Sequence, residues 1–218
     1  MSALIGTANA LQNILDKFRG LDFLGPLALR LYLAPIFIAV GLHKFMNIED
    51  IASWFGNPDW GLGLPAPMLM AYLAAGTELF GGLALLFGVA VRWFAIPLMI
   101  TMLVATFSVH WDHGWFAVAP GNPETSTAKP IAKYLGIDAA KSSLENSEEV
   151  GKRVSAAKTL MKKHGNYDWL SEKGGFVVLN NGIEFAVTYF IMLLVLFFIG
   201  AGKYFSIDYW LHKAFREK

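Results

Sequence analysis

The feature that most constrains this chain is a pair of apolar runs within residues 68–110, joined by a short hinge around Arg92. Each run has about 20 residues, and a helix of that length, at about 1.5 Å per residue, crosses the roughly 30 Å hydrocarbon core of a bilayer. The pattern predicts a transmembrane helical hairpin. Glu78 in the first arm has Ala74 and Gly82 at helical spacing. The carboxylate thus shares a face with small residues, and we expect that face to meet another helix rather than lipid.

Apolar runs of similar length occur on either side of the hairpin. We therefore expect four spans, at about 26–46, 68–90, 92–110 and 176–201, with Pro35 kinking the first. With 55% hydrophobic and only 16% charged residues, the chain is too apolar for an ordinary soluble domain. The expected fold class is all-α integral membrane: a four-transmembrane-helix bundle that forms a single membrane domain over residues 1–218.

Residues 111–175 lie between the third and fourth runs and are polar, which predicts an extramembranous helical insert. Asn146 and Glu149 form a capping pair for an amphipathic helix within it, and Gly165 is expected to end that helix. Residues 47–67 are rich in Gly, Pro and Trp, which is typical of a short segment at the membrane interface.

Lysine and arginine in short loops predict the orientation of the spans. Basic residues gather in the N-terminal segment, where residues 7–24 have the pattern of an amphipathic interfacial helix, in the hairpin turn and in the tail. The first loop has only Lys44 against three acidic residues. Both termini are therefore expected in the cytoplasm of a bacterial cell, with the 111–175 insert in the periplasm. The N-terminus lacks an apolar core followed by a small-residue cleavage site, so no cleaved signal peptide is expected.

Charge and cysteine content exclude several classes of function. A net charge of +1 gives no concentrated basic surface, which argues against a nucleic-acid partner. The sequence has no cysteine, and this excludes disulfides, thiolate metal sites and a CxxC redox couple within the chain. Any redox chemistry would have to come from a cofactor or a partner.

Three charged residues are candidates for a position deep in the hydrocarbon: Arg30, Glu78 and Glu184. A charge deep in hydrocarbon costs about 2.5–3.5 kcal/mol on insertion scales, so each requires a partner, a hydrated cavity or a function. Arg30 and Glu78 are within side-chain reach if their helices are adjacent. Such a pair could take part in chemistry or could only fix the register of the helices, and the sequence leaves both open.

The fourth run carries a polar stripe, because Asn180 and Thr188 are each four residues from Glu184. Polar groups near the outer ends of the spans could meet in one pocket, namely His43, Lys44, His110, Asn181 and Glu184. One interpretation is a ligand or proton-transfer site centred on Glu184 and His110. The other is that the histidines and the lysine reach the membrane surface while asparagines hold Glu184.

The candidate catalytic residues are thus Glu184, Glu78 and His110, and the candidate binding residues are Arg30, Lys44 and Asn181. Copper is a weaker possibility, with His110 and His43 as weak ligand candidates. Methionine is a soft ligand for Cu(I), and Met68, Met70, Met99 and Met102 lie near the polar groups. Methionines on apolar helices are more often packing residues.

Several strings resemble the DoxX family of small four-helix membrane proteins, namely RLYLAPIFIAVGLHKF, TELFGGLALLFGVAVRW and SVHWDHGW. A narrower resemblance to the HvfX-like branch rests on WFGNPDWGLGLP, HGNYDW, FVVLNNGIEFAVTYF and SIDYW. The resemblance implies a bundle in the bacterial inner membrane that works with proteins maturing a modified, ribosomally made copper-binding peptide, including an iron-dependent oxidase. The family's name also implies a link to quinol oxidation and to electron transfer from thiosulfate to quinone.

These observations favour an accessory component in the maturation or export of a copper-binding peptide. One alternative is a quinone-linked oxidoreductase subunit, in which quinone binds between helices, Glu184 or Glu78 relays protons, and Arg30 or Lys44 polarises a carbonyl. Another is a small-molecule or metal transporter formed by a homodimer, with the Gly81–Gly82 pair at the contact, although a monomer could equally bury these glycines.

Overall fold

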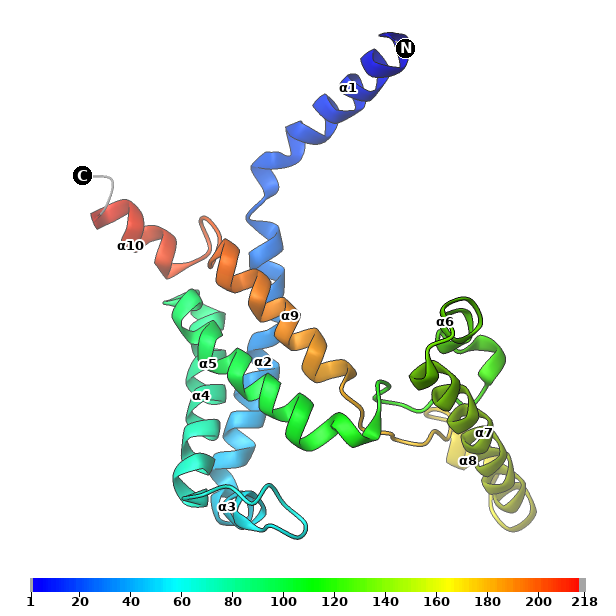
Figure 1. Ribbon diagram of the computed structural model, residues 1–218. Coiled ribbons are helices and arrows are strands. Elements are labelled where there is room, and N and C mark those ends of the chain that lie inside the picture. The colour runs from blue at the N-terminus through cyan, green and yellow to red at the C-terminus, as the bar shows by residue number, and fades with distance from the viewer. Residues whose placement is uncertain (1, 216–218) are drawn as a thin grey trace. The chain divides into compact units, whose positions relative to one another are not determined.

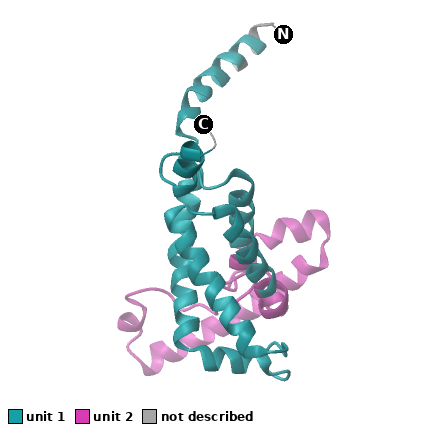
Figure 2. Ribbon diagram, turned by 90° about the vertical axis from the view of Figure 1, so that its left-hand side faces the viewer, with its two compact units in different colours: residues 1–104, 188–218 teal, residues 105–187 magenta. Residues whose placement is uncertain are grey.

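The computed structural model describes residues 2–215, and within them the regular elements are helices apart from one antiparallel bridge between Val118 and Leu179 (Figure 1). This confirms the all-α class. The chain divides into two compact units: unit 1 comprises residues 1–104 and 188–218, and unit 2 comprises residues 105–187 (Figure 2).

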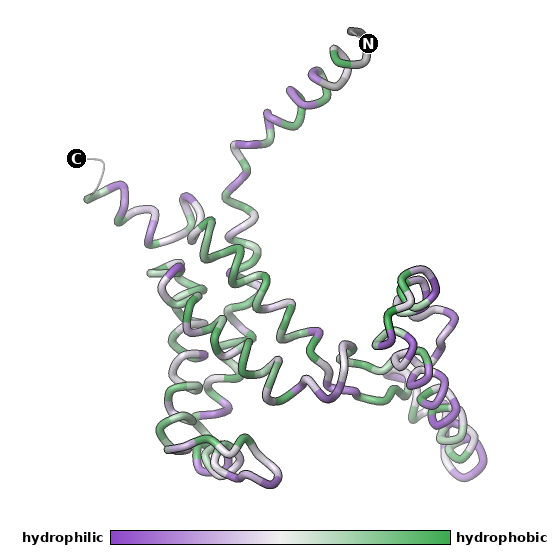
Figure 3. The backbone as a smooth tube through the Cα atoms, viewed as in Figure 1, coloured by the Kyte–Doolittle hydropathy of each residue, from purple (hydrophilic) through white to green (hydrophobic). Residues whose placement is uncertain are grey.

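Three helical runs are long and apolar enough to cross a membrane. They are α2 (Leu24–Met46), α4 (Pro67–Phe87) and Val91–His113, which joins α5 (Val91–Val104) to the short segments η2 (Ala105–His110) and η3 (Trp111–His113). Figure 3 shows the apolar residues that dominate these runs. The sequence prediction of an apolar hairpin is confirmed, with Gly88 capping the end of α4 in a left-handed conformation (φ 66°).

The fourth apolar run differs from the prediction at its beginning. Helix α9 (Glu184–Ile199) begins at Glu184, not at Phe176, and its 16 residues give a length of about 24 Å, less than the roughly 30 Å of a hydrocarbon core. Residues before Glu184 are not helical because Asn181 adopts a left-handed conformation (φ 57°) and the backbone from Asn180 to Glu184 donates to carbonyls of residues 114–117.

Glycines allow α2 and α4 to pack closely. A Cβ atom at Gly41 would lie 2.4 Å from the backbone N of Leu79, and one at Gly82 would lie 2.8 Å from the backbone N of Ile38. Gly81 in turn faces Leu98 of α5. Both members of the predicted dimerisation pair are thus buried within one chain, and the basis for a homodimer through Gly81 and Gly82 is removed.

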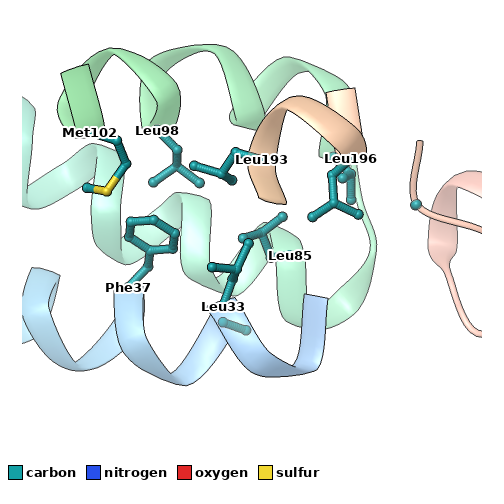
Figure 4. Packing of buried hydrophobic residues seen from close by; sticks show 10 residues of the cluster. Leu33, Phe37, Leu85, Leu98, Met102, Leu193 and Leu196 are labelled. Carbon is teal, nitrogen blue, oxygen red and sulfur yellow. The ribbon is translucent and has the colours of Figure 1, made fainter. Parts of the chain in front are cut away.

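The apolar core of unit 1 lies among α2, α4, α5 and α9. Figure 4 shows its labelled members, which are Leu33, Phe37, Leu85, Leu98, Met102, Leu193 and Leu196. A smaller cluster joins α3 (Ile48–Gly56) to α4 through Ala52, Phe55 and Ala71. The predicted interfacial segment 47–67 is therefore half helical.

The ends of unit 1 carry three further segments. Helix α1 (Ser2–Asp16) and the 3-10 turn η1 (Lys17–Leu21) cover the predicted amphipathic stretch, and α10 (Ile207–Phe215) follows the loop after α9.

Unit 2 contains the polar insert. Its helices are α6 (Ala128–Leu135), α7 (Asp138–His164) and α8 (Tyr167–Ser171), with a 3-10 turn η4 (Pro123–Thr125). The predicted cap at Asn146 is wrong, because α7 begins at Asp138 and Asn146 lies inside it. Ion pairs within the helix, such as Asp138 with Lys141, support this earlier start. Gly165 ends α7 as predicted, with its N–H donating to the carbonyl of Met161.

Candidate functional site

The closest charge pair in the spans joins Lys44 of α2 to Glu78 of α4. Lys44 Nζ donates to Glu78 Oε1 at 2.6 Å, and the side chains are 20% and 3% exposed, respectively. The close approach of α2 and α4 at Gly41 brings these residues together. The predicted small-residue face around Glu78 is confirmed, with Gly82 against α2 and the carboxylate in the protein interior.

The second oxygen of Glu78 lacks a hydrogen-bond partner within the described residues. Glu78 Oε2 is buried, whereas Oε1 is bonded to Lys44. An unpaired carboxylate oxygen in a low-dielectric interior is costly, and such an oxygen is a ready acceptor for a proton or for an O–H or N–H donor. The Lys44–Glu78 pair therefore has the chemistry expected of a site that exchanges protons or binds a polar group.

The predicted pair of Arg30 with Glu78 is wrong. Arg30 lies near the start of α2 and α4 runs antiparallel to it, so Arg30 faces the end of α4. The contact between Gly41 and Leu79 fixes this register and leaves Lys44 opposite Glu78. The sequence places Arg30 and Glu78 in expected spans, but it does not specify the register between the two helices.

Arg30 donates to four backbone carbonyls. The acceptors are Leu85 O (2.7 Å) and Leu86 O (3.0 Å) at the end of α4, and Ala201 O (2.7 Å) and Phe205 O (3.1 Å) in the segment after α9. Carbonyls at the end of a helix carry partial negative charge and attract a cation. Arg30 is thus a positioning residue that joins α2, α4 and the C-terminal segment.

Asp208 of α10 is a positioning residue that the sequence analysis missed. Its carboxylate accepts from the N–H groups of Ala90 (2.6 Å) and Val91 (3.1 Å), and its own N–H donates to Gly88 O (2.9 Å). A carboxylate at the start of α5 compensates the helix dipole. The signal in the sequence was an acidic residue within a mostly basic tail, in SIDYW.

Glu184 lies at the first turn of α9 within unit 2. Its Oε2 accepts from the N–H of Ala117 at 3.0 Å, and Asn180 Nδ2 donates to the carbonyl of Phe116 at 3.1 Å. The predicted helical stripe of Asn180 with Glu184 is wrong, because Asn180 precedes the helix. Glu184 and Asn180 instead bind the backbone of the segment that follows η3.

His110 and Asn181 are brought together, as the sequence analysis expected for an outer cluster. His110 Nδ1 lies 2.8 Å from the carbonyl oxygen of Asn181, so the contact is to the backbone and not to the amide side chain. His43 lies 3.2 Å from Asn47 Nδ2 at the end of α2, in unit 1. No group of three or more His, Cys, Asp or Glu side chains suited to a metal ion occurs in the part of the chain that the structure describes.

Unit 2 contains a groove of about 470 Å³ between α7 and two loop segments. Its lining includes Gly121, Asn122, Val150, Val154, Lys158 and Val177. Beside it, Ala119 N donates to Val178 O at 3.0 Å and Asn180 N donates to Ala117 O at 2.9 Å. Val118 and Leu179 therefore face each other in a non-hydrogen-bonded pair. The backbone N–H and C=O of Leu179 point away from Val118.

The outer edge formed by Leu179 is open. Within residues 2–215, no hydrogen bond is found for its backbone groups, and the side chains of Val177 and Leu179 are 66% and 72% exposed. An extended segment with an unpaired edge can accept another extended chain.

The apolar helices and buried charges of unit 1 define a helical membrane protein. The family model that matches is DoxX, over residues 25–111, the part of the chain that holds α2, α4 and α5. This segment includes Arg30 and the Lys44–Glu78 pair.

Two relatives are similar to this chain over part of their length. A Bacillus subtilis protein named "Putative oxidoreductase CatD" is 36% identical over 86 residues, which are 39% of this chain and 60% of the relative. An uncharacterized Haemophilus influenzae protein is 33% identical over 93 residues, which are 41% of this chain and 59% of the relative. The chain thus spans about three fifths of the length of the curated relatives it matches. No solved structure matches the chain.

Proposed function

We propose that this protein is a multi-pass protein of the bacterial inner membrane in which α2, α4, α5 with η2, and α9 are the four spans. The distribution of lysine and arginine supports cytoplasmic termini and a periplasmic 111–175 insert. The short helix α9 can serve as a span because a bilayer thins locally around a helix that is shorter than its hydrocarbon core.

Its proposed role is that of an accessory component in the maturation or export of a ribosomally made copper-binding peptide. The observation that carries this proposal is the open edge at Leu179 beside the groove of unit 2. A peptide can add to such an edge through backbone hydrogen bonds while the groove selects its side chains. The resemblance of HGNYDW and of FVVLNNGIEFAVTYF to the HvfX-like branch supports a peptide as the partner.

Site-specific photo-crosslinking in cells tests this role. A benzophenone amino acid at Leu179 should capture a short ribosomal peptide in copper-stressed cells, identified by mass spectrometry. The same group at Tyr134, an exposed position of α6 outside the groove, is the control. Capture at Leu179 alone supports the proposal. No peptide at Leu179, or equal capture at both positions, contradicts it.

A quinone-linked oxidoreductase subunit is the second candidate, favoured by the buried Glu78 Oε2 and by the name of the Bacillus relative. A quinone bound in the membrane would take two electrons and two protons in becoming a quinol, with the electrons supplied by a partner protein. In this arrangement Glu78 exchanges protons and Lys44 orients the carboxylate and stabilises its charge.

Native mass spectrometry of the protein released from lipid nanodiscs distinguishes the two candidates. A stoichiometric quinone that is lost in Glu78→Gln but retained in Glu184→Gln would support the redox role, because Glu184 is bonded to the backbone of unit 2. A quinone-free protein that still crosslinks the peptide at Leu179 would support the accessory role.

A further inference from the structure

A cavity of about 460 Å³ lies where α5 begins, α9 has ended and α10 passes by. Its basic side chains are Arg92 and His212, and its apolar lining includes Trp93, Leu211 and Phe215. All of these residues belong to unit 1, and none takes part in the Lys44–Glu78 pair or in the groove of unit 2.

Arg92 is held in place by its inner nitrogen. Nε donates to Phe197 O at 2.8 Å, and the guanidinium lies 5.6 Å from the centre of the Phe197 ring. Within the described residues, the two terminal nitrogens of Arg92 have no protein hydrogen-bond partner. A fixed guanidinium with free terminal N–H groups has the planar fork that binds phosphate oxygens in pairs.

The one acidic residue in the lining does not offset this basic character. Both carboxylate oxygens of Asp208 accept backbone N–H groups, from Ala90 and from Val91. Its charge is therefore compensated by the first amides of α5. Arg92 and His212 remain as donors toward the cavity.

The apolar residues around the cavity are exposed. Trp93 and Phe215 are 76% and 78% exposed, and Leu211 on α10 is also exposed. A large apolar patch is unfavourable in water, whereas aromatic rings and basic side chains at the end of a membrane span suit the headgroup level of a bilayer. The combination of free basic donors and exposed apolar walls fits a ligand that has an anionic head and hydrocarbon tails.

We propose that this cavity binds an anionic glycerophospholipid, with the phosphate on Arg92 and His212 and the acyl chains against Trp93, Leu211 and Phe215. A lipid bound there would contact the start of α5 and the face of α10 together. It would therefore hold α10 at the membrane surface.

Native mass spectrometry of the detergent-solubilised full chain, titrated separately with dioleoyl phosphatidylglycerol and dioleoyl phosphatidylcholine, tests the proposal. The wild type should bind phosphatidylglycerol more tightly than phosphatidylcholine, by about fivefold for each basic contact. This is the factor expected for one basic residue near an anionic surface. Arg92→Gln should lose this preference. Lys213→Gln, which removes the same charge from α10 outside the cavity lining, should keep it.

A second variant and a competition with phosphate complete the test. If Arg92→Gln does not fold, as judged by circular dichroism, His212→Gln should still reduce the preference for phosphatidylglycerol. Equal binding of the two lipids by the wild type, or an unchanged preference in the folded variants, would overturn the proposal. Displacement of the anionic lipid by millimolar inorganic phosphate would also overturn it, because the cavity would then be a site for free phosphate.

Discussion

At the scale of residues, the buried Arg30 and the partly buried Lys44 of α2 have different kinds of partner. Arg30 donates to four neutral carbonyls, whereas Lys44 donates to the carboxylate of Glu78. Hydrocarbon offers no water to replace a lost partner, so each charge depends on the groups around it. Lys44 and Glu78 in particular depend on each other, and Glu78 retains one oxygen for a further donor.

Removing Lys44 alone should destabilise unit 1 more than removing both charges. Lys44→Met leaves the Glu78 carboxylate buried without its cation, at an expected cost of about 3 kcal/mol, near the lower end of the range for buried pairs because Lys44 is partly exposed. The double variant Lys44→Met, Glu78→Leu should recover most of this loss. The free energy of unfolding in mixed detergent micelles measures both. A double variant as unstable as the single one would show that the pair is not coupled.

At the scale of elements, the packing of α2 on α4 depends on glycine. Gly41→Ala places a methyl group against the backbone of Leu79, so we expect a loss of about 1–3 kcal/mol of stability. Gly76→Ala on α4 is the matched control, since its nearest neighbours are side-chain atoms at 3.9 Å or more. That change should be neutral or stabilising by up to about 1 kcal/mol. Thermal unfolding followed by circular dichroism compares the two, and equal losses would contradict the close approach of the helices.

The segment before α9, in unit 2, also requires a glycine at a close approach between backbones. A Cβ atom at Gly182 would lie 2.5 Å from the carbonyl oxygens of Gly114 and Phe116. Gly182→Ala should therefore loosen the hydrogen bonds between residues 180–184 and 114–117, seen as faster amide exchange by mass spectrometry. Gly175→Ala, which meets no atom within 4 Å, should leave exchange unchanged. Slow exchange in Gly182→Ala would argue against this contact.

The sequence predicted these elements to different degrees. Apolar runs specify helices locally, so α2, α4 and α5 follow from hydropathy and length. The beginnings of α7 and α9 do not, because the first lies in a polar stretch without an apolar run and the second depends on hydrogen bonds to a distant loop.

The sequence identified the residues of the candidate site but not which of them form the ion pair. Lys44 and Glu78 were both identified as candidates, but the partner of Glu78 depends on the register that Gly41 sets between two helices. Asp208 and Arg92 act through the backbone N–H and C=O groups of other segments, and these contacts leave no periodic pattern in a sequence.

At the scale of the whole molecule, the chain has two compact units, and residues 25–111, which match the DoxX family model, lie mostly in unit 1. Hydrogen bonds join distant parts of the sequence in unit 1, because Arg30 in α2 donates to the carbonyls of Ala201 and Phe205 after α9. The loop before α10 is thereby fixed to α2, and Asp208 joins α10 itself to the start of α5.

Arg30→Lys should release this C-terminal segment. A lysine keeps the charge but cannot reach four carbonyls in the fixed geometry of a guanidinium, so we expect a loss of about 3 kcal/mol. Limited proteolysis should then cleave within residues 200–215 faster than in the wild type. Arg19→Lys, an exposed position, is the control and should be cleaved at the wild-type rate. Equal protection of both variants would show that Arg30 does not hold the segment.

The carbonyl partners of Arg30 also constrain the order of biogenesis. Ala201 and Phe205 follow Arg30 by 171 and 175 residues, which at ribosomal speed correspond to a delay of about 10–30 s. During that interval α2 carries a guanidinium whose acceptors have not all been synthesised. The contacts that Arg30 makes in the folded protein are therefore complete only after residues 201–205 have been synthesised.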